Sequence, residues 1–226
     1  MRRAQHAGST AAAAAGASGS SSGQEEAWGD GLYACPAFKA NGGVLSISNF
    51  FSQVDFSAVV ADCEALAKRA QPERNSLAKG RMIAAVPQGG TIAGAVLSEA
   101  VCTRVGRKVG RQLLAGDYPV ELRIYRPGSY MEWHVDDVMY SEPQYEMIYT
   151  VTNTTDSLTQ WIDASGATVS HWPEPNSLIC VRAGGALHQV TRVGRGERII
   201  IKFILTPTLE KGAMFHEYLT TLNPFA

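Results

Sequence analysis

The sequence predicts a mainly β fold, a sandwich or barrel, with helices packed on one face. After Pro119 the chain breaks into short β-rich runs separated by turn clusters such as Arg126-Pro127-Gly128. Many short strands at regular spacing are typical of sandwiches and barrels. The preceding segment instead shows apolar residues at three- and four-residue spacing, which indicates amphipathic helices. We therefore expect helical support over residues 52–116 and a β core over residues 120–207.

The predicted helices follow a short strand at residues 43–51, which runs into a turn. From Ser52 an apolar face predicts a helix that closes before Pro72. Its members are Phe56, Val59, Val60, Cys63, Leu66 and Ala67. Residues 71–90 are rich in Pro and Gly and predict a loop or a short strand.

A second helix is expected to begin at Ser98, a good N-cap residue, and to stop at Gly116. Its apolar stripe consists of Val101, Val105, Val109 and Leu113. Its other side is basic, with Arg104, Arg107, Lys108 and Arg111. Such a face is usually solvated, although it also fits an acidic partner or nucleic acid.

The β core is expected to hold eight strands. They are predicted at residues 121–125, 130–134, 145–152, 158–162, 167–171, 177–182, 186–190 and 198–205. The whole domain is expected over residues 43–210, and residues 211–226 are expected to form a C-terminal covering segment.

Composition limits the function classes. The chain has 226 residues, enough for one domain with a sizeable core. Its net charge of -1 gives no general attraction to nucleic acid or anionic membranes, so both are disfavoured as partners. No apolar run approaches the roughly 18 residues of a membrane-spanning helix. The four cysteines form no CxxC pair, so buried reduced thiols are expected rather than a zinc site.

Residues 1–27 differ from the rest of the chain. They consist mostly of Ala, Gly, Ser and Thr, and no acidic residue precedes Glu25. Such a segment cannot bury apolar side chains and is expected to be a disordered low-complexity tail. The basic start at Arg2 and Arg3 also fits an organellar transit peptide. The expected location is therefore cytoplasmic, or organellar if the tail is a targeting signal.

A His-x-Asp pair, His134 and Asp136, closes one predicted strand. Alternate residues of an extended chain face the same side, so both side chains are expected to point together. His188 follows 54 residues later, directly after Gly184-Gly185. If the folded chain brings His188 to the pair, the three form a 2-His-1-carboxylate site for a divalent metal such as Fe(II).

A candidate anion site lies nearby in sequence. Arg198, ten residues beyond His188, stands in an apolar strand, where a basic group is costly unless it meets an anion. Its planar fork suits a carboxylate, and Lys202 is expected on the same strand face. The alternative is a simple strand salt bridge from Arg198 to Glu121 or Glu197.

Two tyrosines complete the candidate pocket. Tyr125 stands at the end of a predicted strand, where its hydroxyl is expected to donate to the carboxylate bound by Arg198. Tyr149 is expected to line the same pocket. A ketoacid that chelates the metal at one end and pairs with Arg198 at the other would use all of these groups.

Residues 120–207 resemble the Fe(II)- and 2-oxoglutarate-dependent dioxygenase superfamily, and most of all its prolyl 4-hydroxylase-like branch. The resemblance is carried by the Tyr-x2-Gly-x-Tyr-x3-His-x-Asp run that ends at Asp136, by the distal His188, and by Arg198. It implies a double-stranded β-helix, or jelly-roll, in which His134, Asp136 and His188 hold Fe(II). It further implies that Arg198 binds 2-oxoglutarate and that O2 is the oxidant, with ascorbate as an optional reductant.

The implied reaction is hydroxylation of an unactivated C–H bond with release of succinate and CO2. Two departures from the family pattern leave the substrate open between a peptide, such as a prolyl peptide, and a small molecule. Residues 153–157 replace a Gly-rich acidic turn, and Arg198 stands where prolyl hydroxylases often have Lys. Two alternatives remain: a cupin-type metal dioxygenase or isomerase without 2-oxoglutarate, and a non-catalytic jelly-roll binding module. The oligomeric state is not predicted.

Overall fold

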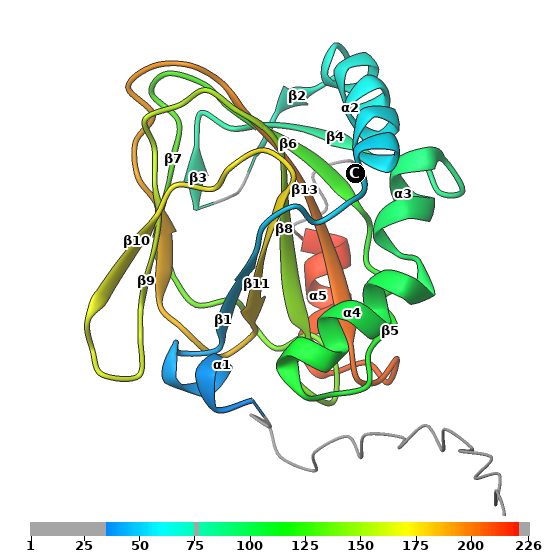
Figure 1. Ribbon diagram of the computed structural model, residues 1–226, viewed down its shortest axis with the longest axis vertical. Coiled ribbons are helices and arrows are strands. Elements are labelled where there is room, and N and C mark those ends of the chain that lie inside the picture. The colour runs from blue at the N-terminus through cyan, green and yellow to red at the C-terminus, as the bar shows by residue number, and fades with distance from the viewer. Residues whose placement is uncertain (1–34, 75–76, 222–226) are drawn as a thin grey trace, which may run out of the picture.

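A computed structural model describes residues 35–74 and 77–221, and its core is a pair of antiparallel sheets that face each other (Figure 1). The larger, eight-stranded sheet has the order β1 (Val44–Ile47), β11 (Ser177–Arg182), β8 (Tyr145–Asn153), β13 (Arg198–Thr206), β6 (Glu121–Tyr125), β4 (Met82–Ala85) and β2 (Gln71–Pro72), with β5 (Leu114–Ala115) paired to β13. The smaller sheet has the order β10 (Thr168–His171), β9 (Thr159–Ile162), β12 (His188–Val190), β7 (Tyr130–His134) and β3 (Ala78–Lys79).

From β6 onward the chain passes back and forth between the two sheets. β6, β8, β11 and β13 belong to the larger sheet, whereas β7, β9, β10 and β12 belong to the smaller one. This alternation makes a double-stranded β-helix, so the predicted fold class is confirmed. All eight strands predicted for the β core are present, with ends within two residues of the prediction.

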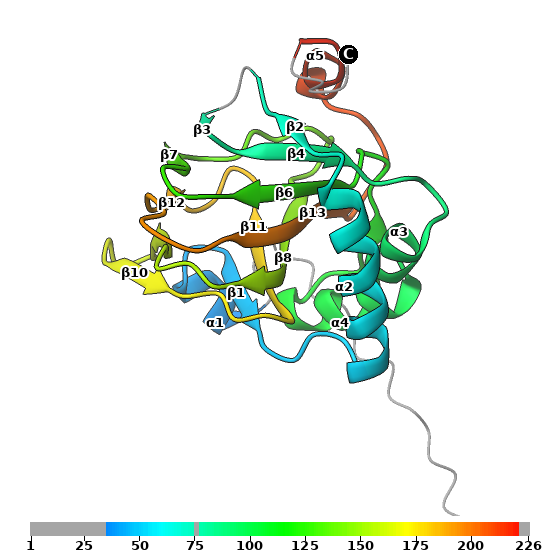
Figure 2. The same cartoon turned by 90° about the horizontal axis from the view of Figure 1, so that it is seen from above.

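Three helices cover the outer face of the larger sheet, on the side away from the smaller sheet (Figures 1 and 2). They are α2 (Gln53–Ala67), α3 (Thr91–Val96) and α4 (Glu99–Val109). Two further helices, α1 (Pro36–Ala40) and α5 (Ala213–Thr221), precede β1 and follow β13. Within the described residues, no helix has both the length and the apolar character needed to cross a membrane.

Helix α2 forms where the apolar spacing predicted it. The Ser52 side chain accepts a hydrogen bond from the Asp55 amide and caps the first turn, a contact typically worth about 1 kcal/mol. Val59 and Cys63 are fully buried against the larger sheet. These buried side chains hold the helix against the sheet.

Helix α4 begins as predicted, with Ser98 accepting from the Val101 amide, but it ends earlier. Gly110 adopts the left-handed conformation, with φ of 71°, and closes the helix there, so the predicted stop at Gly116 is wrong. Leu113 is buried outside the helix. The basic face is partly used inside the fold, because Arg104 donates to the Phe50 carbonyl and Arg111 pairs with Glu142.

Other elements were not expected. The folded part begins before Gly43, because α1 starts at Pro36. Residues 71–90, predicted to be a loop or a short strand, contain three short strands, β2, β3 and β4, and α3 follows directly. The predicted tail, residues 1–27, lies outside the described residues, whereas part of the expected covering segment forms α5.

Strands β8 and β13 are buried on both faces. On β13, Ile201 and Phe203 belong to the core shared with the helices, whereas Arg198 and Lys202 face the space between the sheets. On β8 the same division puts Tyr149 on the helix side and Ile148 on the inner side. The period-2 alternation of a strand thus separates an apolar core from a polar interior.

The turn that leads into β13 is held by residues 153–157, which replace the Gly-rich acidic turn of the family that the sequence resembles. The Asp156 carboxylate accepts from the amides of Gly194 and Arg195, and the Thr154 amide donates to the Glu197 carbonyl. Gly196 has φ of 79° and fits so closely that an added Cβ would lie 2.3 Å from the Thr154 carbonyl oxygen. This contact sets where β13, and with it Arg198, begins.

Replacing Gly196 with Ala should lower the free energy of unfolding by about 3 kcal/mol or more, because a left-handed backbone and a backbone clash add together. Gly166→Ala is the matched control, since Gly166 has φ of 83° and no atom within 4 Å of an added Cβ. That change should cost only about 1 kcal/mol. Urea unfolding measures both, and equal losses would contradict the tight contact at Thr154.

Candidate metal centre and its cavity

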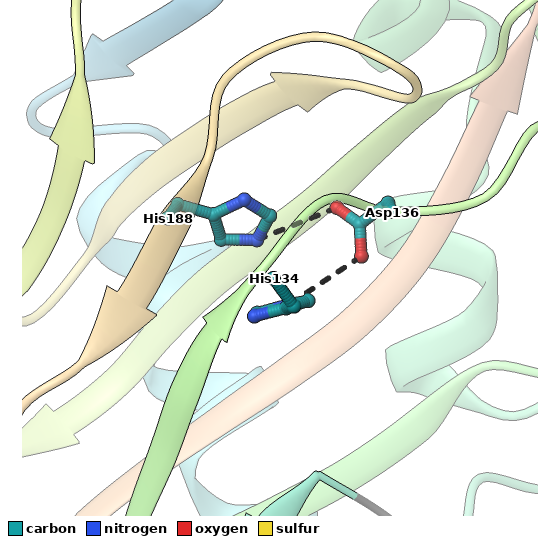
Figure 3. Close-up of side chains that lie close together, drawn as sticks. All are labelled: His134, Asp136 and His188. Atoms are coloured by element: carbon teal, nitrogen blue, oxygen red, sulfur yellow. Dashed lines mark ion pairs between the residues drawn. The ribbon is translucent and has the colours of Figure 1, made fainter.

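Two histidines and one aspartate converge at one end of the smaller sheet. His134 is the last residue of β7, His188 is the first residue of β12, and the two are directly paired across these neighbouring strands. The His134 Nε2 lies 3.7 Å from Asp136 Oδ1, and the His188 Nε2 lies 3.4 Å from Asp136 Oδ2 (Figure 3). One ligand atom from each residue falls within 4.8 Å of the others.

The convergence of His134 and Asp136 does not come from simple strand alternation. β7 ends at His134, so Asp136 lies in the following loop, where its carbonyl accepts from the Gly184 amide at 2.8 Å. The pairing of β7 with β12 also shifts, because His188 opposes His134 while Val190 opposes Met131. One extra residue on β7 forms a bulge, which lets Met131 and His134 both face the cavity.

Both imidazole rings are oriented by backbone carbonyls. The His134 Nδ1–H donates to the Glu132 carbonyl at 2.8 Å, and the His188 Nδ1–H donates to the Ala186 carbonyl at 3.0 Å. Because a carbonyl only accepts, these bonds leave each Nε2 as a lone-pair donor toward Asp136. Burial, and then the nearby His188, hold the pKa of His134 below its usual value, although Asp136 offsets part of this.

This donor set fits Fe(II). Two neutral imidazole nitrogens and one carboxylate form the facial arrangement used by non-haem Fe(II) oxygenases, which leaves coordination positions open. A structural zinc site would instead need four ligands, and the described residues offer three here. The geometry therefore matches the predicted metal site in its residues and in its open character.

A cavity of about 520 Å³, including its open mouth, lies between the two sheets and contains the triad. Arg198, Tyr125 and Lys202 also line it, as predicted. Tyr149 does not, and the predicted role for that residue is therefore wrong. Its hydroxyl donates instead to Asn176 Oδ1 at 2.9 Å within the helix-side core, because odd-numbered residues of this part of β8 face the helices.

Arg198 is a buried cation that has no carboxylate partner among the described residues. Its side chain is 1% exposed, and its Nη1 donates to Thr159 Oγ1 at 3.1 Å. Its Nε has no hydrogen-bond partner within the described part of the chain. Burial lowers the pKa of Arg198 to about 10, and the Tyr125 hydroxyl offsets a little of this.

The alternative of a strand salt bridge for Arg198 is wrong. Glu121 Oε2 pairs with Arg123 at 2.6 Å, and Glu197 pairs with Arg126 at 2.8 Å. Both candidate partners are thus engaged elsewhere. The guanidinium faces the cavity, and no carboxylate in residues 35–74 or 77–221 balances its positive charge.

Tyr125 is held by a residue that the sequence analysis missed. Arg81 donates from Nη1 to the Tyr125 hydroxyl at 2.9 Å and forms a two-point ion pair with Glu73. Because a guanidinium only donates, the hydroxyl oxygen accepts this bond, and the hydroxyl itself donates to Met131 Sδ at 3.9 Å, a weak acceptor. Burial lowers the pKa of Arg81, but Tyr125 and Glu73 outweigh it and raise the net value. An Arg and a Glu in a breaker-rich loop gave no sequence signal for this contact.

Lys202 shares the cavity with Arg198, as strand alternation predicted, but it has its own partner. Its Nζ lies 2.7 Å from Glu146 Oε2, and both side chains are largely buried. Glu146 comes from β8 and was also missed, because a glutamate within an apolar strand is no sign of a pocket by itself. Glu146 therefore balances the charge of Lys202, in contrast to the charge of Arg198.

Comparison with known proteins supports the fold. No model of a known protein family matches the sequence, and no curated protein matches it. Among solved structures, a prolyl-4-hydroxylase from Pseudomonas putida is similar at 17% identity and a TM-score of 0.62, over 76% of this chain and 96% of that one.

Two further structures show the breadth of the likeness. A Trichoplax adhaerens prolyl hydroxylase, in complex with a peptide fragment of hypoxia-inducible factor, matches at 14% identity and a TM-score of 0.59, over 74% of this chain and 84% of that one. HygX from Streptomyces hygroscopicus, with nickel and 2-oxoglutarate bound, matches at 12% identity and a TM-score of 0.60, over 76% and 85%. The chain therefore has the fold of the 2-oxoglutarate–Fe(II) oxygenases.

Removing one candidate ligand should abolish specific metal binding. We expect His188→Ala to weaken Fe(II) or Co(II) binding by more than about 100-fold, because two ligands cannot hold the ion. Anaerobic titration of the metal-free protein measures this affinity. His171→Ala is the control, since His171 is partly buried on β10 but outside the triad. Equal affinities of the two variants would contradict the assignment.

Proposed function

We propose that this protein is an Fe(II)- and 2-oxoglutarate-dependent dioxygenase that hydroxylates an unactivated C–H bond. One observation carries the proposal: the cavity that holds the His134, Asp136 and His188 triad also holds Arg198, a buried cation with no carboxylate partner among the described residues. A ligand that chelates a metal and carries a distant carboxylate would fill the open metal site and pair with Arg198 at the same time.

Desolvation of Arg198 favours such a ligand. An uncompensated buried charge costs several kcal/mol, and a bound carboxylate removes that cost through two parallel hydrogen bonds to the guanidinium. 2-Oxoglutarate has this carboxylate at one end and the chelating ketoacid at the other. The cupin-type alternative without a ketoacid leaves Arg198 unexplained, and a binding module gives no reason for a complete metal triad.

The side chains that line the cavity would bind and orient the metal and the co-substrate. His134, Asp136 and His188 would hold Fe(II), Arg198 would bind the 5-carboxylate, and the Tyr125 hydroxyl would donate to it. When bound, Fe(II) and the ketoacid would supply the oxidising chemistry, in which one oxygen atom of O2 would be inserted into the substrate C–H bond and the other would enter succinate as CO2 leaves. The sheets on either side restrict water, which strengthens each polar contact.

The direct test is anaerobic addition of Fe(II) and 2-oxoglutarate, followed by O2. Chelation of the ketoacid should produce a visible charge-transfer band, and O2 should yield succinate; ascorbate belongs in the assay as a reductant that keeps the iron ferrous. Absence of the band in protein that demonstrably binds iron would overturn the proposal. Succinate formation would exclude the binding-module alternative.

Arg198→Met should weaken 2-oxoglutarate binding by about 100-fold or more, since the carboxylate loses a charge-assisted two-point contact. The same change should leave the ligand-free protein at least as stable as wild type, because it removes an uncompensated buried charge. Calorimetric titration and thermal unfolding measure the two effects. Arg195→Met, at an exposed position, is the control and should change neither. Loss of stability without loss of affinity would indicate a purely structural arginine.

The two tyrosines give a second matched comparison. Tyr125→Phe should weaken 2-oxoglutarate binding by roughly five- to tenfold, because one neutral hydrogen bond to the carboxylate is lost. Tyr149→Phe should leave that affinity unchanged and lower stability by about 1 kcal/mol, because its hydroxyl bonds only to buried Asn176. If Tyr149→Phe weakened ligand binding as much as Tyr125→Phe, the placement of Tyr125 in the co-substrate site would be wrong.

A further inference from the structure

Met131 brings a thioether into the cavity that holds the metal triad. Its side chain comes from β7, three residues before His134, and the bulge in β7 lets both side chains face the cavity. Among the described residues that line this cavity, Met131 is the one that carries sulfur. A thioether is soft, polarisable and readily oxidised to a sulfoxide. The candidate oxygenase centre therefore shares its cavity with an oxidisable side chain.

Two buried donors point at the Met131 sulfur. Arg81 Nη1 donates to it at 3.5 Å, and the Tyr125 hydroxyl donates to it at 3.9 Å. Both donor side chains are buried, Arg81 at 3% and Tyr125 at 1% exposure. A thioether is a weak acceptor, so it satisfies such donors less well than an oxygen atom would. An oxygen atom on the sulfur would give both donors a strong acceptor where they already point.

The sulfur also lies close to the triad. Three residues of an extended strand span roughly 10 Å, and Met131 and His134 both reach inward from β7. After burial and His188, the positive charge of Arg81 also helps to hold the pKa of His134 below its usual value. The guanidinium that contacts the sulfur is thus near enough to act on a candidate metal ligand.

We infer that Met131 is a self-oxidation site: when no substrate fills the cavity, one oxygen atom of O2 is transferred to the Met131 sulfur. The inference rests on the proposed function. The sulfur supplies two electrons and becomes a sulfoxide. 2-Oxoglutarate supplies the other two as it loses CO2 and takes up the second oxygen atom to become succinate, and no proton is released or consumed. A substrate C–H bond would compete for the same oxygen atom, so the sulfoxide would mark unproductive turnover.

The sulfoxide should weaken binding of the co-substrate. Its oxygen would accept from the Tyr125 hydroxyl, the group that the proposed function assigns to the 2-oxoglutarate carboxylate. A hydroxyl has one proton and cannot donate fully to both acceptors. The oxidised protein should therefore bind 2-oxoglutarate roughly five- to tenfold more weakly than the unoxidised protein.

Mass spectrometry after turnover without substrate tests the inference. The full chain receives Fe(II) and 2-oxoglutarate and then O2, without ascorbate and with catalase present to remove free peroxide. Cleavage after Glu isolates Met131 in peptide 122–132, apart from Met82 in peptide 74–99 and Met214 in peptide 211–217. Peptide 122–132 should gain about 16 Da, the mass of one oxygen atom, only when the metal, the ketoacid and O2 are all present.

Met82 and Met214 are matched controls. Like Met131 they are half-buried, but neither lines the cavity. They should stay unmodified during turnover, whereas added hydrogen peroxide should oxidise them. His188→Ala removes a candidate metal ligand and should abolish the gain on peptide 122–132. Met131→Leu has a similar volume and no sulfur, so its affinity for 2-oxoglutarate should be the same before and after the treatment.

The outcomes separate the inference from the proposed function. If the charge-transfer band forms or succinate is released while peptide 122–132 stays unmodified, the inference is wrong and the dioxygenase proposal stands. Equal gains on the Met82 and Met214 peptides, or a gain without 2-oxoglutarate, would also contradict it. If neither the band nor succinate forms, the proposed function fails and the inference fails with it. Unchanged affinity of the oxidised protein, or an equal loss in Met131→Leu, would overturn the effect assigned to the sulfoxide.

Discussion

The burial of β13 on both faces is the constraint on which the rest of the structure depends. Helices α2 and α4 cover one face, so Ile201 and Phe203 pack into an apolar core. The smaller sheet covers the other face, where Arg198 and Lys202 must be satisfied without bulk water. One strand thus joins the stabilising core to the polar interior, and its register fixes where both cations lie.

Arg198 and Lys202, the two cations of β13 that line the cavity, differ in their partners. Lys202 has a carboxylate at 2.7 Å, whereas Arg198 has a neutral hydroxyl from Thr159. A paired charge contributes little net attraction for a second anion, while an unpaired buried one attracts it strongly. The triad of His134, Asp136 and His188 lines the same cavity. Of these two cations, Arg198 is therefore the one suited to hold an anionic ligand in the cavity.

The metal triad depends on irregular backbone rather than on a regular strand. The bulge in β7 turns His134 into the cavity, and the loop after β7 carries Asp136 back toward His188. Backbone carbonyls at Glu132 and Ala186 fix both rings. Bulges beside functional sites commonly re-aim a side chain in this way, at the cost of one ladder hydrogen bond. The Asp156 carboxylate helps to position Arg198 in a similar way, because it accepts from the Gly194 amide and anchors the turn before β13.

The sequence by itself determined the β-rich core, the helix α2, the three candidate metal ligands and the candidate anchor Arg198. These features rest on local patterns, namely strand-length apolar runs, a three- and four-residue apolar spacing, and ligand types at characteristic distances along the chain. Only the tertiary structure decided which face of β8 Tyr149 occupies, because a strand buried on both sides shows no apolar–polar alternation to read. It also decided that Arg81 donates to the Tyr125 hydroxyl and that Glu146 pairs with Lys202, whereas Arg198 meets no carboxylate in the part of the chain that the structure describes. Those pairings join residues far apart in the chain, and which charge finds a partner depends on distances that arise only when the two sheets close on each other.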